Sequence, residues 1–137
     1  MLRMATLSDI PRLIEIRGSV RENRLGDPGR VTLADYAWHI AHAPVHVWEE
    51  EDLIKGMAAG DPRDGSIWAL FVDPAFEGRG IGQALILAAC RSLAAAGHRI
   101  AKLSTEPGTR AEGFYLRNSW LAKGHTERGE VIFVKEL

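Results

Sequence analysis

The sequence predicts an α/β or α+β fold in which helices cover a sheet of mixed strand directions. Apolar runs of strand length alternate with segments of helical periodicity along the chain. The expected order is one strand, two helices, a meander of three strands, then helix, strand, helix and strand. With 137 residues, of which 46% are hydrophobic and 26% charged, the chain is long enough for one core. We therefore expect a single domain over residues 1–137.

The first third of the chain is expected to contain a strand and two helices. Residues 2–7 form a short apolar strand, and Ser8 is the expected N-cap of a helix with Leu13 and Ile16 on its apolar side. Residues 21–30 are polar and rich in turn formers, which predicts a loop. Thr32 then caps a second helix, with Asp35 three residues later in a capping box and Pro44 after its end.

The rest of the chain alternates strands and helices. The meander is expected at residues 45–49, 53–59 and 66–72. Its third strand is almost continuously apolar, as is typical of a central strand covered on both faces. The clearest helix spans residues 81–96, with Gly97 at the position of a C-terminal capping glycine. A strand at 100–104, a helix at 110–118 and a strand at 131–134 complete the chain.

Charge and cysteine content exclude several classes of protein. The 17 lysines and arginines nearly balance the 18 acidic residues, and the net charge of -1 argues against nucleic acid as the main partner. Cys90, the single cysteine, excludes a disulfide framework and a cysteine-based zinc site, and its apolar surroundings predict an inert core thiol. No signal-peptide core and no run of 18 apolar residues is present, so we expect a cytoplasmic protein without a membrane partner.

The most informative segment is the glycine-rich loop at residues 72–82, Val-Asp-Pro-Ala-Phe-Glu-Gly-Arg-Gly-Ile-Gly. Three alternating glycines stand at the start of the helix, where they let a ligand approach the main-chain N–H groups closely. A helix start offers unpaired N–H donors and a partial positive charge, which favour a phosphate or pyrophosphate. No Lys-Ser/Thr follows, as a nucleotide P-loop requires, and Gln83 stands where the Rossmann fingerprint has Gly or Ala.

This loop resembles the acyl-CoA loop of the GNAT N-acetyltransferase superfamily, (Gln/Arg)-x-x-Gly-x-(Gly/Ala). Gly80 and Gly82 match, whereas Glu77 stands in place of Gln or Arg. Residues 111–120, Ala-Glu-Gly-Phe-Tyr-Leu-Arg-Asn-Ser-Trp, resemble the family segment Ala-x-x-Phe-Tyr-x-x-x-Gly-Phe, with Ser119 for glycine and Trp120 for phenylalanine. The two segments stand at the distance that the family requires.

The resemblance implies both a fold and an activity. The fold is a mixed, mostly antiparallel central sheet of six to seven strands, flanked by about four helices and splayed at the acyl-CoA site. The activity is transfer of an acetyl group from acetyl-CoA, the co-substrate, to a primary amine by direct attack. The residues expected to bind acetyl-CoA are Phe71, Val72, Glu77, Gly78, Arg79, Gly80, Ile81, Gly82 and Gln83.

The resemblance also assigns roles to residues outside the loop. Tyr115 is the expected general acid for the CoA thiolate, although without the family context a packing role is favoured. Glu106 is a candidate general base, with a solvated turn carboxylate as the alternative. Asn23 and Arg24 lie in the loop that covers the acceptor site in such folds, and they are candidate substrate contacts or simply solvated residues.

Two alternatives remain open at this stage. A non-catalytic acyl-CoA-binding sensor or partner module stays open because of the departures at Glu77, Gly108 and Ser119, where Gly108 replaces a frequent asparagine, and because the strand at 67–72 has no carboxylate. The acceptor is a small-molecule or peptide amine of unspecified identity, and the apolar last strand is compatible with a homodimer.

His39, His42 and His46 have metal-like spacing, but Pro44 separates them, so no metal is expected.

Overall fold

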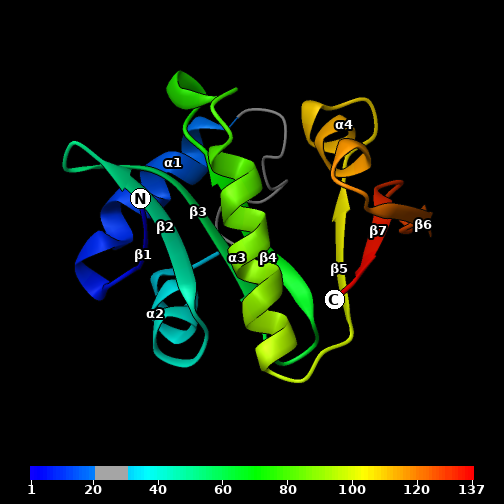
Figure 1. Ribbon diagram of the computed structural model, residues 1–137, viewed down its shortest axis with the longest axis horizontal. Helices are drawn as coiled ribbons and strands as arrows, with labels where there is room; N and C mark the ends of the chain where they lie inside the picture. The colour runs from blue at the N-terminus through cyan, green and yellow to red at the C-terminus, as the bar shows by residue number, and fades with distance from the viewer. Residues whose placement is uncertain (21–30) are drawn as a thin grey trace.

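The computed structural model describes residues 1–20 and 31–137 and contains a seven-stranded sheet in the order β1-β2-β3-β4-β5-β7-β6 (Figure 1). Helices cover both faces of this sheet, so the predicted fold class is confirmed. The strands are β1 (Leu2–Met4), β2 (Val45–Glu50), β3 (Leu53–Asp61), β4 (Ser66–Val72), β5 (Ile100–Thr105), β6 (Leu121–His125) and β7 (Val131–Glu136). The α-helices in the described residues are α1 (Ile10–Ser19), α2 (Leu33–His42), α3 (Ile81–Ala95) and α4 (Arg110–Arg117).

The sheet is antiparallel except where β4 meets β5. These two strands run parallel and pair only at Ser66 and Lys102, whereas β5 pairs with β7 along its whole length. Beyond Ser66, β4 and β5 diverge toward the side of the molecule that carries the start of α3 and α4 (Figure 1). The sheet is therefore splayed, as expected, and the splay leaves the carboxyl end of β4 without a neighbour on one side.

The first helical turn differs from the expectation. β1 ends at Met4 rather than at residue 7, and Thr6, not Ser8, precedes the helical segment. The Asp9 carboxylate accepts the Thr6 backbone N–H at 2.8 Å and the Arg3 guanidinium at 2.8 Å. The Asp9 side chain therefore decides where the helical turn begins, because it accepts a backbone N–H that the helix itself leaves unpaired.

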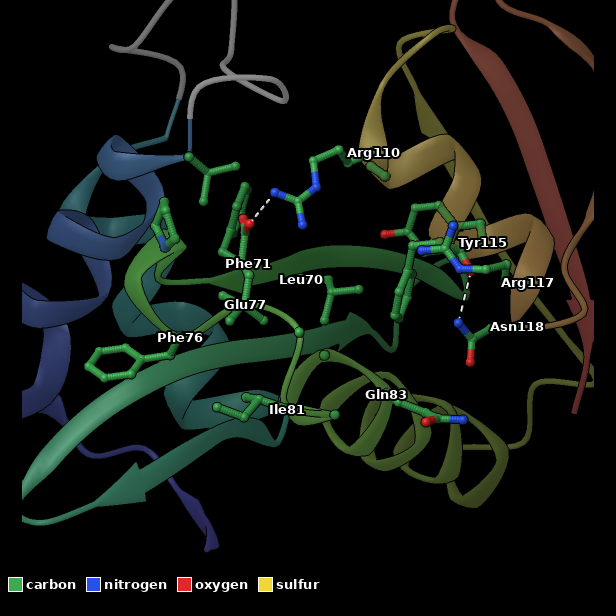
Figure 2. Close-up of a pocket in the computed structure, with 18 of the residues that line it drawn as sticks. Leu70, Phe71, Phe76, Glu77, Ile81, Gln83, Arg110, Tyr115, Arg117 and Asn118 are labelled. Carbon is green, nitrogen blue, oxygen red and sulfur yellow. Dashed lines mark hydrogen bonds and ion pairs between the residues drawn. The ribbon is translucent and has the colours of Figure 1, made fainter.

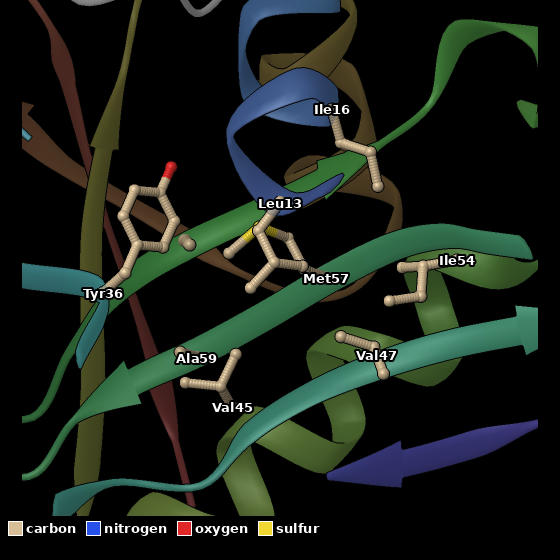
Figure 3. Close-up of a cluster of buried hydrophobic side chains, with 9 residues drawn as sticks. Leu13, Ile16, Tyr36, Val45, Val47, Ile54, Met57 and Ala59 are labelled. Carbon is tan, nitrogen blue, oxygen red and sulfur yellow. The ribbon is translucent and has the colours of Figure 1, made fainter. Parts of the chain in front are cut away.

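Two apolar layers cover opposite faces of the sheet. On one face, α1 and α2 pack over Met57 and Ala59 of β3 (Figure 3). On the other face, α3 packs over Ala58. Successive residues of β3 thus face opposite sides of the sheet, until the pairing of β3 with β4 shifts register after Ala59. On β4, Trp68 packs against the layer formed by α1 and α2.

The strand β6 was not predicted from the sequence. It lies at the edge of the sheet beside β7, and every one of its residues is exposed. A strand without a buried face shows no apolar alternation, so the sequence carries no signal for it. Ser119, just before β6, has a φ of 68°, the left-handed conformation that favours glycine. A serine therefore adopts a glycine-like backbone conformation at the position where the resembling segment has glycine.

Candidate active site

A cavity of about 860 Å³ opens at the splay, between the end of β4, the loop leading to α3, and α4 (Figure 2). Its size is in the range of small-molecule sites. It is lined by Ser19, Val20, Leu70, Phe71, Val72, Pro74, Phe76, Glu77, Gly78, Gly80, Ile81, Gly82, Gln83, Arg110, Ala111, Phe114, Tyr115, Arg117 and Asn118. All the residues predicted to bind the co-substrate are among them, except Arg79. The Arg79 guanidinium lies 5.5 Å from the centre of the Phe76 ring instead.

The start of α3 differs from the starts of α2 and α4. Thr32 and Thr109 cap α2 and α4, each accepting a backbone N–H of the first turn. Gly80 holds the same position before α3, with a φ of 80° and no side chain to act as a cap. The first N–H groups of α3 have no acceptor within the helix, and they belong to residues that line the cavity. This end of the cavity therefore suits an anionic group.

The absence of a side chain at Gly82 keeps the cavity open beside these N–H groups. A Cβ built at Gly82 would lie 3.5 Å from Val72 Cγ2 and 3.5 Å from Phe114 Cε1, which is ordinary contact distance. Val72 and Phe114 also line the cavity. A small side chain therefore fits at Gly82 without a clash, but only by occupying space that a ligand would need.

Glu77, the departure from the family pattern, is neutralised across the cavity. Its carboxylate is ion-paired with the guanidinium of Arg110, the first residue of α4 (Figure 2). Arg117 lines the same cavity, so two arginines and one glutamate give the lining a formal charge of +1. The sequence pattern did not indicate Arg110 and Arg117 as site residues, because only the folding of α4 toward the glycine loop brings them to this cavity.

Tyr115 lines the cavity from α4 and is also a core residue. Its side chain is 7% exposed, and its ring contacts Phe114, Trp120 and Phe133 at centroid distances of 5.3, 5.5 and 5.7 Å. Burial raises the pKa of the Tyr115 phenol above its ordinary value, and the neighbouring Cys90 thiol raises it further. The phenol is therefore protonated throughout the neutral range and can act as a proton donor.

Glu106, the candidate general base, lies away from the cavity lining. Glu106 is exposed and is not among the lining residues, and its backbone carbonyl accepts the Thr109 hydroxyl at 2.8 Å. Asn23 and Arg24 lie outside the described residues.

Asp73 fixes the backbone of the glycine loop. Its carboxylate accepts the Ala75 N–H at 3.0 Å and the Arg12 guanidinium at 2.7 Å. Although burial disfavours the charged form, these two contacts hold the pKa of Asp73 below its usual value. Asp73 therefore ties the beginning of the loop to α1 as a permanent anion at neutral pH.

The histidines have local structural partners. His39 stacks on Trp68 with ring centres 3.9 Å apart, and His46 Nε2 is hydrogen-bonded to the Ser92 hydroxyl at 2.7 Å. Within residues 1–20 and 31–137, no group of three or more His, Cys, Asp or Glu side chains is placed to hold a metal ion. In the same residues, no helix has the length and apolar character needed to cross a membrane.

Comparison with known proteins gives one family and many similar folds. The model of the acetyltransferase (GNAT) family matches residues 10–119. No curated protein sequence matches the chain significantly. A GCN5-related N-acetyltransferase from Rhodopseudomonas palustris is 18% identical with a TM-score of 0.81, covering 100% of this chain and 95% of its own.

Two further solved structures share the fold. The PaiA N-acetyltransferase from Thermoplasma acidophilum, solved in complex with coenzyme A, is 15% identical with a TM-score of 0.79, covering 100% of this chain and 98% of its own. A ribosomal-protein-alanine N-acetyltransferase from Brucella melitensis is 19% identical with a TM-score of 0.74, covering 100% of this chain and 99% of its own.

Proposed function

Because the chain belongs to the GNAT acetyltransferase family, we propose that it transfers the acetyl group of acetyl-CoA to a primary amine. The observation that carries this proposal is the uncapped start of α3, which faces a cavity at the splay of β4 and β5. The cavity combines main-chain donors for an anion with a formal charge of +1 and an apolar wall. These are the requirements of a ligand that joins a pyrophosphate to a thin, mostly uncharged arm.

Each part of acetyl-CoA has a matching part of the cavity. The N–H groups at the start of α3 would bind the pyrophosphate, with Arg110 and Arg117 nearby as cations. The pantetheine arm would pass between β4 and β5, because β4 has no pairing with β5 beyond Ser66. Main-chain groups of Phe71 and Val72 would then hold the arm and orient the thioester.

In the proposed reaction, the amine nitrogen forms a bond to the thioester carbon and the carbon–sulfur bond breaks. The CoA sulfur leaves as a thiolate and takes a proton from the Tyr115 hydroxyl, while the amine gives up one proton to solvent and solvent returns one proton to the Tyr115 phenolate. Catalysis would come mostly from positioning the two reactants and from main-chain donors at the developing oxyanion. Cys90 takes no part, because burial raises the pKa of its thiol and keeps it protonated.

The lining offers no unpaired carboxylate as a base. Among the lining residues that the structure describes, Glu77 is the only acidic one, and Arg110 pairs with it. We therefore propose that the amine arrives neutral or loses its proton through water. Glu106, which is exposed outside the lining, would act as the base only through such a water.

Two measurements test the proposal against a sensor that binds acyl-CoA without chemistry. Acetyl-CoA and CoA should raise the melting temperature, whereas ATP and NAD should not, because stabilisation requires binding to the folded state. Release of free thiol from acetyl-CoA should then appear with at least one member of a broad amine panel. Equal stabilisation by ATP would indicate a generic phosphate site, and binding of acetyl-CoA without turnover on any amine would favour the sensor.

A further inference from the structure

Arg17, in the last turn of α1, is a half-buried cation that forms no ion pair with any residue of 1–20 or 31–137. Among the described residues, its Nε and Nη2 atoms are buried and have no hydrogen-bond partner. By contrast, Arg3, Arg12 and Arg63 each form an ion pair with an aspartate. Leaving charged donors buried and unsatisfied is costly, so such a group requires an explanation.

The guanidinium lies among three aromatic rings. Its Cζ atom is 4.7 Å from the centre of the Phe71 ring, 5.0 Å from that of Trp68 and 5.8 Å from that of Tyr36. These ring faces attract the cation, but they accept no N–H hydrogen bond of ordinary strength. Burial lowers the pKa of Arg17 despite the neighbouring Tyr36 and Asp35, yet an arginine keeps its charge at neutral pH.

This aromatic cage borders the cavity from the side opposite α3. Phe71 belongs both to the cage and to the cavity lining. Ser19 and Val20, which follow Arg17 at the end of α1, also line the cavity. The cavity therefore extends through the splay from the glycine loop toward α1, and its α1 end lies next to the cage that holds the Arg17 guanidinium.

We infer that Arg17 binds a carboxylate of the acceptor, so that the acceptor is an amine that also carries a carboxylate group, such as a free amino acid. This inference rests on the proposed acetyl transfer. The co-substrate would occupy the α3 end of the cavity, which leaves the α1 end for the acceptor. A planar guanidinium forms two parallel hydrogen bonds with a carboxylate, and two unpaired N–H-bearing atoms are present.

The test compares free amino acids with the matching amino-acid amides as acceptors. The amine of an amide is more often neutral, so the informative quantity is the acid-to-amide ratio of kcat/KM in each variant. Arg17→Met should lower this ratio about 10- to 100-fold relative to the parent, as expected for loss of a charge-assisted hydrogen bond. Arg17→Lys, which keeps the charge without the planar fork, should retain part of the preference.

Arg63→Met is the matched control. Arg63 also lies over an aromatic ring, 3.8 Å from the centre of Trp38, but Asp61 pairs with it at the end of β4 remote from the cavity. Its substitution should leave the acid-to-amide ratio unchanged. Arg17→Met should fold with equal or higher stability, since an apolar side chain replaces an uncompensated buried charge. Circular dichroism and the melting temperature check this.

A second readout does not need turnover. Trp68 lies in the cage, so binding of a free amino acid to the CoA complex should change tryptophan fluorescence in the parent and not in Arg17→Met. An unchanged acid-to-amide ratio in Arg17→Met would overturn the inference while the acetyl transfer stands. If no amine is acetylated but the amino acid binds through Arg17, the proposed acetyl transfer is refuted and the carboxylate-binding role of Arg17 is supported. No binding and no turnover in the parent would overturn both.

Discussion

Replacing Gly82 with valine should abolish acetyl-CoA binding while the fold survives. The Cβ of any residue at this position lies 3.5 Å from Val72 and from Phe114, so the first added atom fits. The two methyl groups of valine must then extend into the cavity beside the first N–H groups of α3. Gly82 is not among the glycines with positive φ, so its backbone accepts a side chain without strain.

The size of the effect follows from the hydrogen bonds that the pyrophosphate would lose. A hydrogen bond to a charged group contributes about 1.5–3 kcal/mol, and loss of two of them corresponds to a decrease in affinity of about 10²–10⁴-fold. Gly82→Ala adds only the Cβ, so CoA affinity should fall about tenfold or less in this variant. Its stability should rise by about 0.5 kcal/mol, because alanine is the better helix former.

The assay is isothermal titration with CoA, together with the melting temperature of each ligand-free variant. Ala94→Val is the control, because it places the same side chain on an exposed position of α3. It should leave CoA affinity unchanged and lower stability by about 0.5 kcal/mol, the helix-propensity cost of valine against alanine. CoA binding by folded Gly82→Val within threefold of the parent would refute the placement of the pyrophosphate at the start of α3.

Three further variants have expected outcomes. Tyr115→Phe should lower kcat about 10²–10⁴-fold with unchanged CoA affinity, and unchanged turnover would leave Tyr115 a packing residue. The parent should also lose stability above pH 10 more steeply than this variant, because the pKa of Tyr115 is raised in the folded state and unfolding releases its proton. Glu77→Gln should tighten CoA binding about three- to tenfold with a steeper salt dependence, because it removes a negative charge from the lining; weaker binding would contradict this. Arg3→Met should lower stability by about 1 kcal/mol at pH 7, and its stability should fall less than the parent's below pH 4, because Arg3 lowers the pKa of Asp9 and acid removes that contribution; parallel acid unfolding curves would argue against it.

Sequence patterns predicted the central elements well. The apolar run of β4 gave the bounds of that strand, and helical periodicity placed α3 within one residue of its observed end. Both elements are buried, and burial is what imposes a periodic pattern on a sequence. The exposed edge strand β6 carried no such pattern and was missed.

In the candidate site too, some features could be predicted from the sequence and others could not. The glycine loop was identified from the sequence, because main-chain access to a ligand requires glycine at defined positions within one short segment. The pairing of Arg110 with Glu77 was not, because those residues lie far apart in the chain and meet only when α4 folds toward the loop. The charge of Glu77 is therefore partly offset in the folded protein by a residue that the sequence pattern did not link to it.

Local chemistry thus determined the class of fold, the glycine loop and the capping of α2 by Thr32, since each depends on neighbours within a few residues. Only the tertiary structure decided which charges are paired and which are left unpaired. Arg12 and Arg17 occupy the same helix, yet one reaches Asp73 and the other is enclosed by aromatic rings. Whether a charge finds a partner depends on how helices and sheet pack, because electrostatic pairing is decided by distances in space and by burial.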